Sequence, residues 1–148
     1  MHQKIIIRWA VGEDAPALAK LNMSFNNVSR EVAKIEDSLK RSSELVAIAE
    51  FDGVPAGFAC AQAHQSFCYD GSEAEITEMF VEEEFRRNGI ASRLIEFLED
   101  GLQQQGVQSI KILTGHKNQT AVMTYEAAGY VQEQHLVLAK TLFQDKRN

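Results

Sequence analysis

The turn Arg86-Arg87-Asn88-Gly89-Ile90-Ala91 has the residues of an anion-binding site. Gly89 has no Cβ, so the chain can turn tightly there, and the first amides of a following helix have no partner inside that helix. These N–H groups and the positive end of the helix dipole favour an anion, so the sequence predicts a phosphate or pyrophosphate site. The turn matches neither G-x-x-x-x-G-K-[ST] nor G-x-G-x-x-G, which excludes two familiar phosphate loops.

A strand and a helix must position this turn. The run from Ile76 to Val81 is rich in strand-forming residues, and after the turn the apolar period changes to three and four residues. The predicted helix face carries Ile90, Leu94, Phe97, Leu98 and Leu102. A further strand over 108–114 completes a βαβ unit with parallel strands and a right-handed crossover. The turn then lies at the carboxyl end of the first strand, where α/β sheets usually hold ligands.

Periodicity and turn signals predict the other elements. They are a strand over 5–10, helices over 14–25 and 32–40, strands over 45–51 and 54–63, and a helix from Asn118 to Ala128. Asp52-Gly53 is a strong hairpin signal between the two middle strands. Phe67 and Tyr69, in the Ser66–Ser72 loop, are candidates for substrate contact, although simple packing is favoured.

Composition indicates one globular domain over residues 1–148. The chain is 45% hydrophobic and 24% charged, and no apolar run has the length of a membrane span or a signal peptide, so we expect a cytoplasmic protein with no membrane partner. The net charge of −6 argues against a nucleic-acid partner. Cys60 and Cys68 have neither a disulfide framework nor metal spacing, so no metal is assigned, and Cys60 is expected in the core.

Two motifs in order resemble the GNAT superfamily of N-acetyltransferases. Arg86, Gly89 and Ala91 match the coenzyme loop [RQ]-x-x-G-x-[GA]. A second signature of that family, N-x-x-A-x-x-x-Y-x-x-x-G-[FY], is matched by Asn118, Ala121, Tyr125, Gly129 and Tyr130. The resemblance implies an α/β fold of one domain, in which a mixed, mostly antiparallel sheet has a splayed parallel strand pair that forms an acetyl-CoA cleft. It also implies a last strand, which Leu136–Leu142 would supply.

The resemblance also assigns roles to residues. Backbone groups of Met79, Phe80 and Val81 would bind the pantetheine arm of acetyl-CoA, and Tyr125 would protonate the departing thiolate as general acid. The other residues assigned to coenzyme binding are Arg86, Arg87, Asn88, Gly89, Ile90, Ala91, Ser92 and Asn118, with Tyr125 also in contact. His116, just before Asn118, is interpreted as a solvated loop residue.

Two carboxylates are candidates for the general base. Glu75 and Glu78 lie on the strand that borders the cleft, and ordinary alternation would put Glu75 and Thr77 on one face and Glu78 on the other. Members of the family often have a bulge here, which breaks that alternation. Either residue could act directly or through water, and either could be only a surface acid.

The acceptor is expected to be a primary amine on a small cationic molecule. The acidic run Glu73, Glu75, Glu78, Glu82, Glu83 and Glu84 favours a cation near the sheet. The resemblance extends to small members that include aminoglycoside 3-N-acetyltransferases, and polyamines fit equally. The alternatives are acetylation of protein lysines or N-termini, and a non-catalytic acetyl-CoA sensor. A homodimer is left open.

Overall fold

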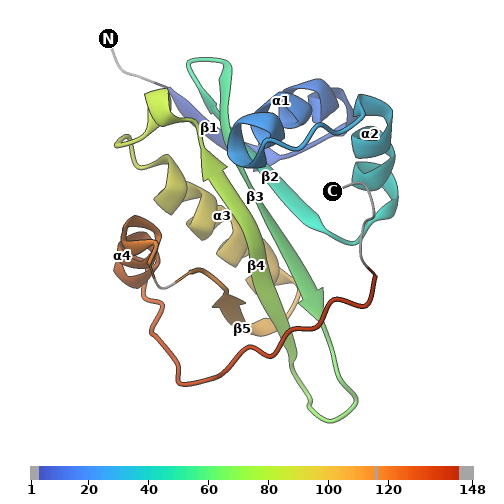
Figure 1. Ribbon diagram of the computed structural model, residues 1–148, viewed down its shortest axis with the longest axis vertical. Coiled ribbons are helices and arrows are strands. Elements are labelled where there is room, and N and C mark those ends of the chain that lie inside the picture. Colours follow the sequence, from blue (N-terminus) through green and yellow to red (C-terminus); the bar gives the residue numbers. More distant parts are fainter. Residues whose placement is uncertain (1–3, 116, 144–148) are drawn as a thin grey trace.

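The computed structural model describes residues 4–115 and 117–143, which form one five-stranded sheet covered by helices on both faces (Figure 1). The strands are β1 (Ile5–Trp9), β2 (Leu45–Phe51), β3 (Val54–His64), β4 (Ser72–Val81) and β5 (Val107–Ile112). The helices are α1 (Ala15–Asn26), α2 (Val32–Arg41), α3 (Ile90–Gln104) and α4 (Gln119–Ala127), with short 3-10 turns η1 (Gly12–Asp14) and η2 (Glu83–Phe85). All but one of the elements expected from the sequence are therefore present.

The strand order is the chain order, β1 to β5. Neighbouring strands are antiparallel except β4 and β5, which are parallel and joined through α3. Helices α1 and α2 lie on one face of the sheet and α3 on the other (Figure 1). This mixed sheet with one parallel pair confirms the expected fold class.

The two faces of the sheet have separate apolar cores. On one face, Leu94, Leu98 and Leu102 of α3 pack on small residues of the central strands, such as Ala59. On the other face, a second cluster joins α1 to the sheet through Leu18, Leu21, Ile48, Phe58 and Cys60. Burial on both faces explains why β2 and β3 are apolar almost throughout, without the alternation of a half-exposed strand.

A bulge in β4 controls which side chains face α1 and α2. Cys60 of β3 pairs with Glu78, but the next residue, Ala61, pairs with Ile76, so Thr77 is the extra residue of the bulge. Ala74 and Ile76 point into the α3 core, which leaves Glu75 on the opposite face. Because the bulge shifts the alternation by one residue, Glu78 joins Glu75 on the face of α1 and α2.

A buried ion pair holds the start of the chain against the sheet. The two nitrogens of Arg8 donate to the Asp14 carboxylate at 2.7 and 2.8 Å, and Nη2 also donates to Glu50 at 2.9 Å. The Val11 amide donates a further bond to Asp14 at 2.8 Å. Asp14 is 8% exposed, and its bonds to Arg8 hold the pKa of that carboxyl below its usual value.

Two expectations are wrong, one about the segment after α4 and one about the loop between β3 and β4. The segment Leu136–Leu142 forms no strand, and its apolar side chains are exposed, Leu136 at 89% and Leu142 at 89%. Phe67 and Tyr69 do not pack either, since both side chains are exposed at the tip between β3 and β4. The resemblance to the family implied this strand, but a strand also needs a neighbour, and the described residues supply none for this segment.

Candidate active site

The turn between β4 and α3 has the backbone of an anion cradle. Arg87 and Gly89 both have positive φ, 68° and 77°, and α3 begins at Ile90. In the described part of the chain, the amides of Arg87, Asn88 and Gly89 donate no hydrogen bond, and no side chain caps the helix. The first turn of α3 adds further free N–H groups, which together with the helix dipole can bind a pyrophosphate.

Side chains fix the shape of this turn from within. The side-chain nitrogen Nδ2 of Asn88 donates to the carbonyls of Phe85 at 2.9 Å and Arg86 at 3.3 Å. Nε of Arg86 donates to the Val81 carbonyl at 2.9 Å, and its guanidinium lies 5.8 Å from the centre of the Phe80 ring. Arg86 is therefore bound back onto β4, whereas Arg87 is exposed beside the turn.

The two parallel strands separate just before this turn. β5 pairs with β4 only from Ser72 to Ile76, so Met79, Phe80 and Val81 have no strand partner on the β5 side among the described residues. On their other side they pair with β3. Unpaired backbone groups of a strand can bind an extended ligand as they would bind another strand. The structure thus places a free strand edge next to the anion cradle.

Tyr125 is a residue of α4, and α4 lies beyond β5 at the edge of the sheet (Figure 1). The helix begins as expected, because the Asn118 side chain accepts a hydrogen bond from the Ala121 amide at 3.3 Å. Tyr125 is half-buried, its ring centre lies 6.4 Å from that of Tyr130, and burial raises the pKa of its hydroxyl. A phenol with a raised pKa keeps its proton at neutral pH and can donate it.

Glu78 and Glu75 differ in exposure, although they share a face. Glu78 is exposed and sits opposite Cys60, while Glu75 is half-buried and sits opposite Gln62. Phe80, two residues beyond Glu78, packs on Phe25 of α1 with ring centres 5.4 Å apart. Glu78 is therefore the carboxylate nearer to the helical pair, and the other acids of the run, Glu82 to Glu84, lie beyond the end of β4.

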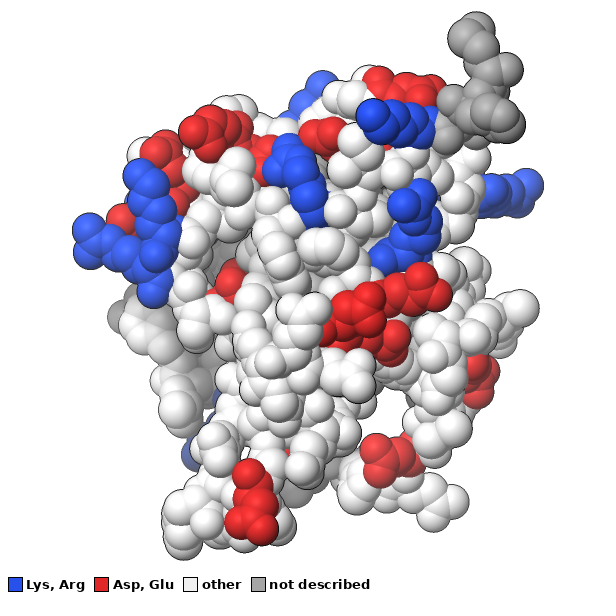
Figure 2. Space-filling view, turned by 180° about the vertical axis from the view of Figure 1, so that it is seen from behind, with Lys and Arg blue, Asp and Glu red and all other residues white. Residues whose placement is uncertain are grey.

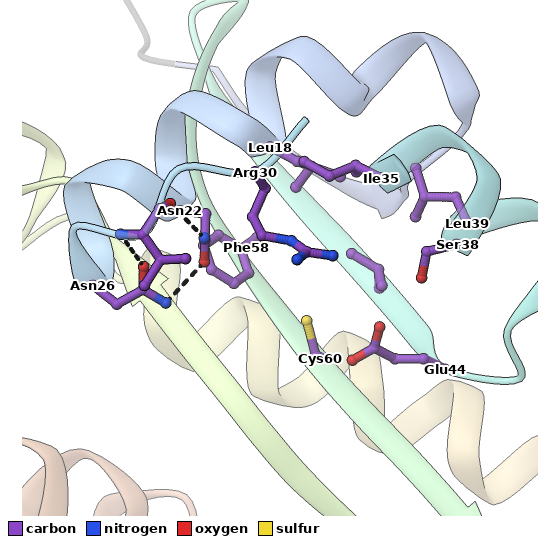
Figure 3. A pocket seen from close by; sticks show the side chains of 12 residues that line it. Leu18, Asn22, Asn26, Arg30, Ile35, Ser38, Leu39, Glu44, Phe58 and Cys60 are labelled. Carbon is purple, nitrogen blue, oxygen red and sulfur yellow. Dashed lines mark hydrogen bonds between the residues drawn. The ribbon is translucent and has the colours of Figure 1, made fainter. Parts of the chain in front are cut away.

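A cleft of about 340 Å³ opens beside Glu78, between α1, α2 and the sheet (Figure 3). Its lining is mostly apolar, with Phe58 and Cys60 on its floor. Two charged side chains enter it, the Arg30 guanidinium from the loop between the helices and the Glu44 carboxylate from just before β2 (Figure 3). The remaining lining residues are Leu18, Asn22, Asn26, Val28, Ile35, Ser38, Leu39 and Val46.

Glu44 and Cys60 were not predicted as site residues. Burial raises the pKa of the Glu44 carboxyl, the Cys60 thiol beside it lowers that pKa, and the charge of Glu78 raises it. Burial is also the main reason that the pKa of Cys60 lies far above its usual range, so this thiol is no nucleophile at neutral pH. The Glu44 carboxylate therefore feels the negative charge of Glu78, while the Arg30 guanidinium brings a positive charge into the same cleft.

The structure also bears on metal binding and on membrane insertion. Residues 4–115 and 117–143 contain no group of three or more His, Cys, Asp or Glu side chains placed to hold a metal ion. Within the same residues, no helix combines the length and the apolar character needed to cross a bilayer. His116 lies outside the described residues.

Comparison with known proteins agrees with this geometry. The model of the Acetyltransferase (GNAT) family matches residues 13–130. An acetyltransferase of Yersinia enterocolitica serotype O:8 / biotype 1B, YE1169, is 29% identical over 112 residues, which are 76% of this chain and 75% of that protein.

Two solved structures share the fold at low sequence identity. The aminoglycoside N-acetyltransferase AAC(6')-Iy in complex with CoA has a TM-score of 0.83 and 19% identity, covering 97% of this chain and 98% of its own. A ribosomal-protein-alanine N-acetyltransferase from Brucella melitensis biovar Abortus has a TM-score of 0.79 and 17% identity, covering 93% and 99%. The family match spans both coenzyme motifs and most of the chain, and the protein therefore belongs to the GNAT family of acetyltransferases.

Proposed function

We propose that this enzyme transfers the acetyl group of acetyl-CoA directly to a primary amine of a small cationic molecule, of the aminoglycoside or polyamine kind. The observation that carries the proposal is the cleft under α1 and α2, which the Glu44 carboxylate enters and whose lining residue Cys60 pairs with Glu78. A half-buried carboxylate with a raised pKa is stabilised when an ammonium group binds beside it. Among similar folds, AAC(6')-Iy is known with a bisubstrate analogue of CoA and an acetylneamine.

Coenzyme binding would use the backbone rather than specific side chains. The free edge of Met79–Val81 would bind the pantetheine arm, and the amides from Arg87 through Ser92 would hold the pyrophosphate. The positive φ of Gly89 keeps the turn open toward the ligand. Asn118 would contribute from the start of α4, on the other side of the separated strands.

The acceptor amine must lose a proton before it attacks the thioester. An alkyl ammonium has a pKa of about 10.4, so it binds mainly in the charged form, and Glu78, directly or through water, would take the proton. Glu75, on the same face, is the second candidate for this base. The nitrogen then bonds to the carbonyl carbon, the carbon–sulfur bond breaks, and the Tyr125 hydroxyl would give its proton to the departing thiolate.

Two variants with matched backbone strain test the coenzyme site. Gly89 and Gly53 have φ of 77° and 81°, and a Cβ at either position would meet no atom within 4 Å. Gly89→Glu and Gly53→Glu should therefore lose similar stability, but only Gly89→Glu would place a carboxylate where the pyrophosphate binds. Acetyl-CoA at a hundred times its Kd should stabilise the wild type and Gly53→Glu by about 2.7 kcal/mol, and Gly89→Glu by none.

CoA release measured over a panel of amines then tests the reaction. Polyamines and aminoglycosides should release CoA faster than neutral amines of similar size and faster than peptides with a free lysine or N-terminus. Faster release with peptides would support a protein acetyltransferase, and coenzyme binding without release on any amine would support a sensor. Thermal stabilisation that is equal in all three proteins would remove the proposed coenzyme site.

A further inference from the structure

The cleft under α1 and α2 contains one charge of each sign. On the face seen from behind, Lys and Arg side chains are interspersed with Asp and Glu side chains over the upper half of the molecule (Figure 2). In the cleft, the Arg30 guanidinium enters from the loop between the helices and the Glu44 carboxylate from just before β2 (Figure 3). Neither forms an ion pair with the other or with any residue in 4–115 and 117–143. Both charges are therefore open to a ligand.

A closed set of hydrogen bonds holds the loop that carries Arg30. The Asn22 side-chain amide donates to the Val28 carbonyl at 3.1 Å, and the Val28 backbone amide donates to the Asn26 side-chain oxygen at 3.0 Å. The Asn26 side-chain amide donates in turn to the Asn22 side-chain oxygen at 3.1 Å (Figure 3). The loop thus has a defined shape two residues before Arg30. Because both asparagine side chains are engaged in it, Arg30 and Glu44 are the main polar groups that a ligand meets.

The rest of the lining is mostly apolar, and the cleft is small. The helices contribute Leu18, Ile35 and Leu39 to its walls, and the sheet contributes Val46 and Phe58. Its volume of about 340 Å³ lies near the lower end of the range of about 300–1,000 Å³ that small-molecule sites occupy. A short methylene chain with charged ends matches such a site, whereas a molecule of several sugar rings would extend beyond it.

We infer that the acceptor is a small diamino acid whose carboxylate binds Arg30 and whose neighbouring ammonium group binds Glu44. The inference rests on the proposed function, since it specifies the small cationic acceptor of that reaction. The guanidinium presents a planar fork of N–H groups that can donate two parallel hydrogen bonds to a carboxylate. A diamino acid has two ammonium groups and one carboxylate at neutral pH, so it satisfies both cleft residues and remains cationic. The amine at the far end of its chain is then the one left to attack the thioester.

The two charged residues of the cleft favour different groups of the acceptor. Burial and the charge of Glu78 raise the pKa of the Glu44 carboxyl, and Arg30 is not among the groups that lower it, so an ammonium group beside Glu44 is stabilised. At Arg30, a second ammonium group is repelled and a carboxylate is attracted. A phosphate group would bring about two negative charges toward Glu44 and Glu78, so the single charge of a carboxylate fits better. The cleft therefore prefers a diamino acid to a diamine of the same length.

CoA release with acceptors of equal length tests this preference. L-lysine, L-lysine amide and cadaverine share one chain and its terminal amine, but the amide has a neutral group in place of the carboxylate and cadaverine has none. Ornithine, its amide and putrescine repeat the comparison with a shorter chain. At the length that the enzyme uses faster, kcat/KM should be at least about 10-fold higher for the amino acid than for its amide or the diamine, as expected for hydrogen bonds to a charged group on an exposed arginine.

The outcomes separate this inference from the proposed function. Release that is as fast with the amide, the diamine or an aminoglycoside as with the diamino acid would overturn the inference and leave transfer to a small cationic amine in place. A lack of CoA release with every amine would remove the proposed function, and the inference with it.

Substitutions of Arg30 identify the group that binds the carboxylate. Arg30→Gln should raise KM for L-lysine at least about 10-fold and lower KM for cadaverine, because it removes both the fork and the repulsion. Arg30→Lys keeps the charge without the fork and should lie between Arg30→Gln and the wild type. The control is Arg41→Gln, which also removes one positive charge but lies on α2, where Arg41 pairs with Asp37 and does not line the cleft. It should keep the wild-type preference. Equal changes of KM for L-lysine and cadaverine in Arg30→Gln would overturn the inference, since they would show a general effect of charge.

Discussion

The parts of the chain before and after Leu102 are packed very differently. Within the described residues, every buried side chain lies between Asp14 and Leu102, whereas none after Leu102 is buried. The proposed phosphate-binding turn at Gly89 belongs to the first part, and Tyr125 belongs to the second. Coenzyme binding therefore rests on a rigid core, while the proposed general acid rests on α4, which depends on few contacts of its own. In the proposed function, the first part provides the affinity for the coenzyme. The position of Tyr125, in the loosely packed second part, is the feature that can be regulated.

Two leucine substitutions test this contrast most directly. Leu98 is 0% exposed and Leu138 is 91% exposed. Leu98→Ala should lower the free energy of unfolding by about 2–5 kcal/mol, because it removes buried methyl groups and leaves a cavity. Leu138→Ala should change it by less than about 0.5 kcal/mol, provided that urea denaturation is measured on dilute, monomeric protein. Similar losses in both variants would mean that the segment after α4 packs on its own chain in solution.

Tyr125→Phe tests whether the loosely packed part carries chemistry. The variant keeps the ring and its contact with Tyr130 but removes the proton donor. We expect kcat to fall by roughly 10²-fold, or about 2.7 kcal/mol in the barrier, with the Kd of acetyl-CoA unchanged.

Tyr130→Phe serves as the control for Tyr125→Phe, because it removes the bond to Glu99 and leaves the Tyr125 hydroxyl in place. Its kcat should fall less than that of Tyr125→Phe. Equal rates for Tyr125→Phe and the wild type at saturating substrates would show that the thiolate leaves without this acid.

The sequence predicts most of the first part because its signals are local. The change of period from β4 to α3, the glycine of the turn and the Asp52-Gly53 hairpin all act over a few residues. The strand over 136–142 failed for a different reason. It follows from the resemblance to the family and not from a local pattern, and strand formation depends on a neighbour, which the described residues do not provide.

The acceptor cleft was missed because it is assembled from distant segments. Glu44, Cys60 and Glu78 come together only through the register of β2, β3 and β4. One available signal was a single carboxylate, Glu44, at the start of the apolar run from Leu45 to Ala49. A charge at the end of a buried strand is either paired or close to a ligand site, and sequence alone does not decide between these.

Asp14→Asn tests how much one charged contact contributes to the stability of the packed part. The pKa of Asp14 is lowered in the folded state, so its stabilising effect is full above the usual value of 3.8 and is lost as pH falls through the lower folded value. At neutral pH the variant should lose about 1.5 kcal/mol, the low end for hydrogen bonds to a charged group, because the Arg8 side chain is 37% exposed. The difference between wild type and variant should shrink below pH 3.8, as followed by urea denaturation. A constant difference across this range would mean that Asp14 contributes through packing alone.

The smallest effect is expected at the proposed acceptor cleft, where charge would attract the substrate without taking part in bond making. Glu44→Gln keeps the shape of the side chain and removes its charge, so KM for a polyamine should rise by about 3- to 10-fold while kcat stays the same. Salt should weaken acceptor binding less in this variant than in the wild type, because charges are screened over about 8 Å at physiological ionic strength.

Two further variants separate this attraction from general charge and from catalysis. Asp37→Asn makes the same change in net charge on α2, where Asp37 pairs with Arg41 and does not line the cleft, and it should leave KM unchanged. Glu78→Gln should instead lower kcat and shift the pH optimum upward if Glu78 is the base, and Glu75→Gln should do so if Glu75 is. Equal KM values in Glu44→Gln and Asp37→Asn would show that the charge of Glu44 does not affect acceptor binding. A neutral amine would then be the better candidate for the acceptor.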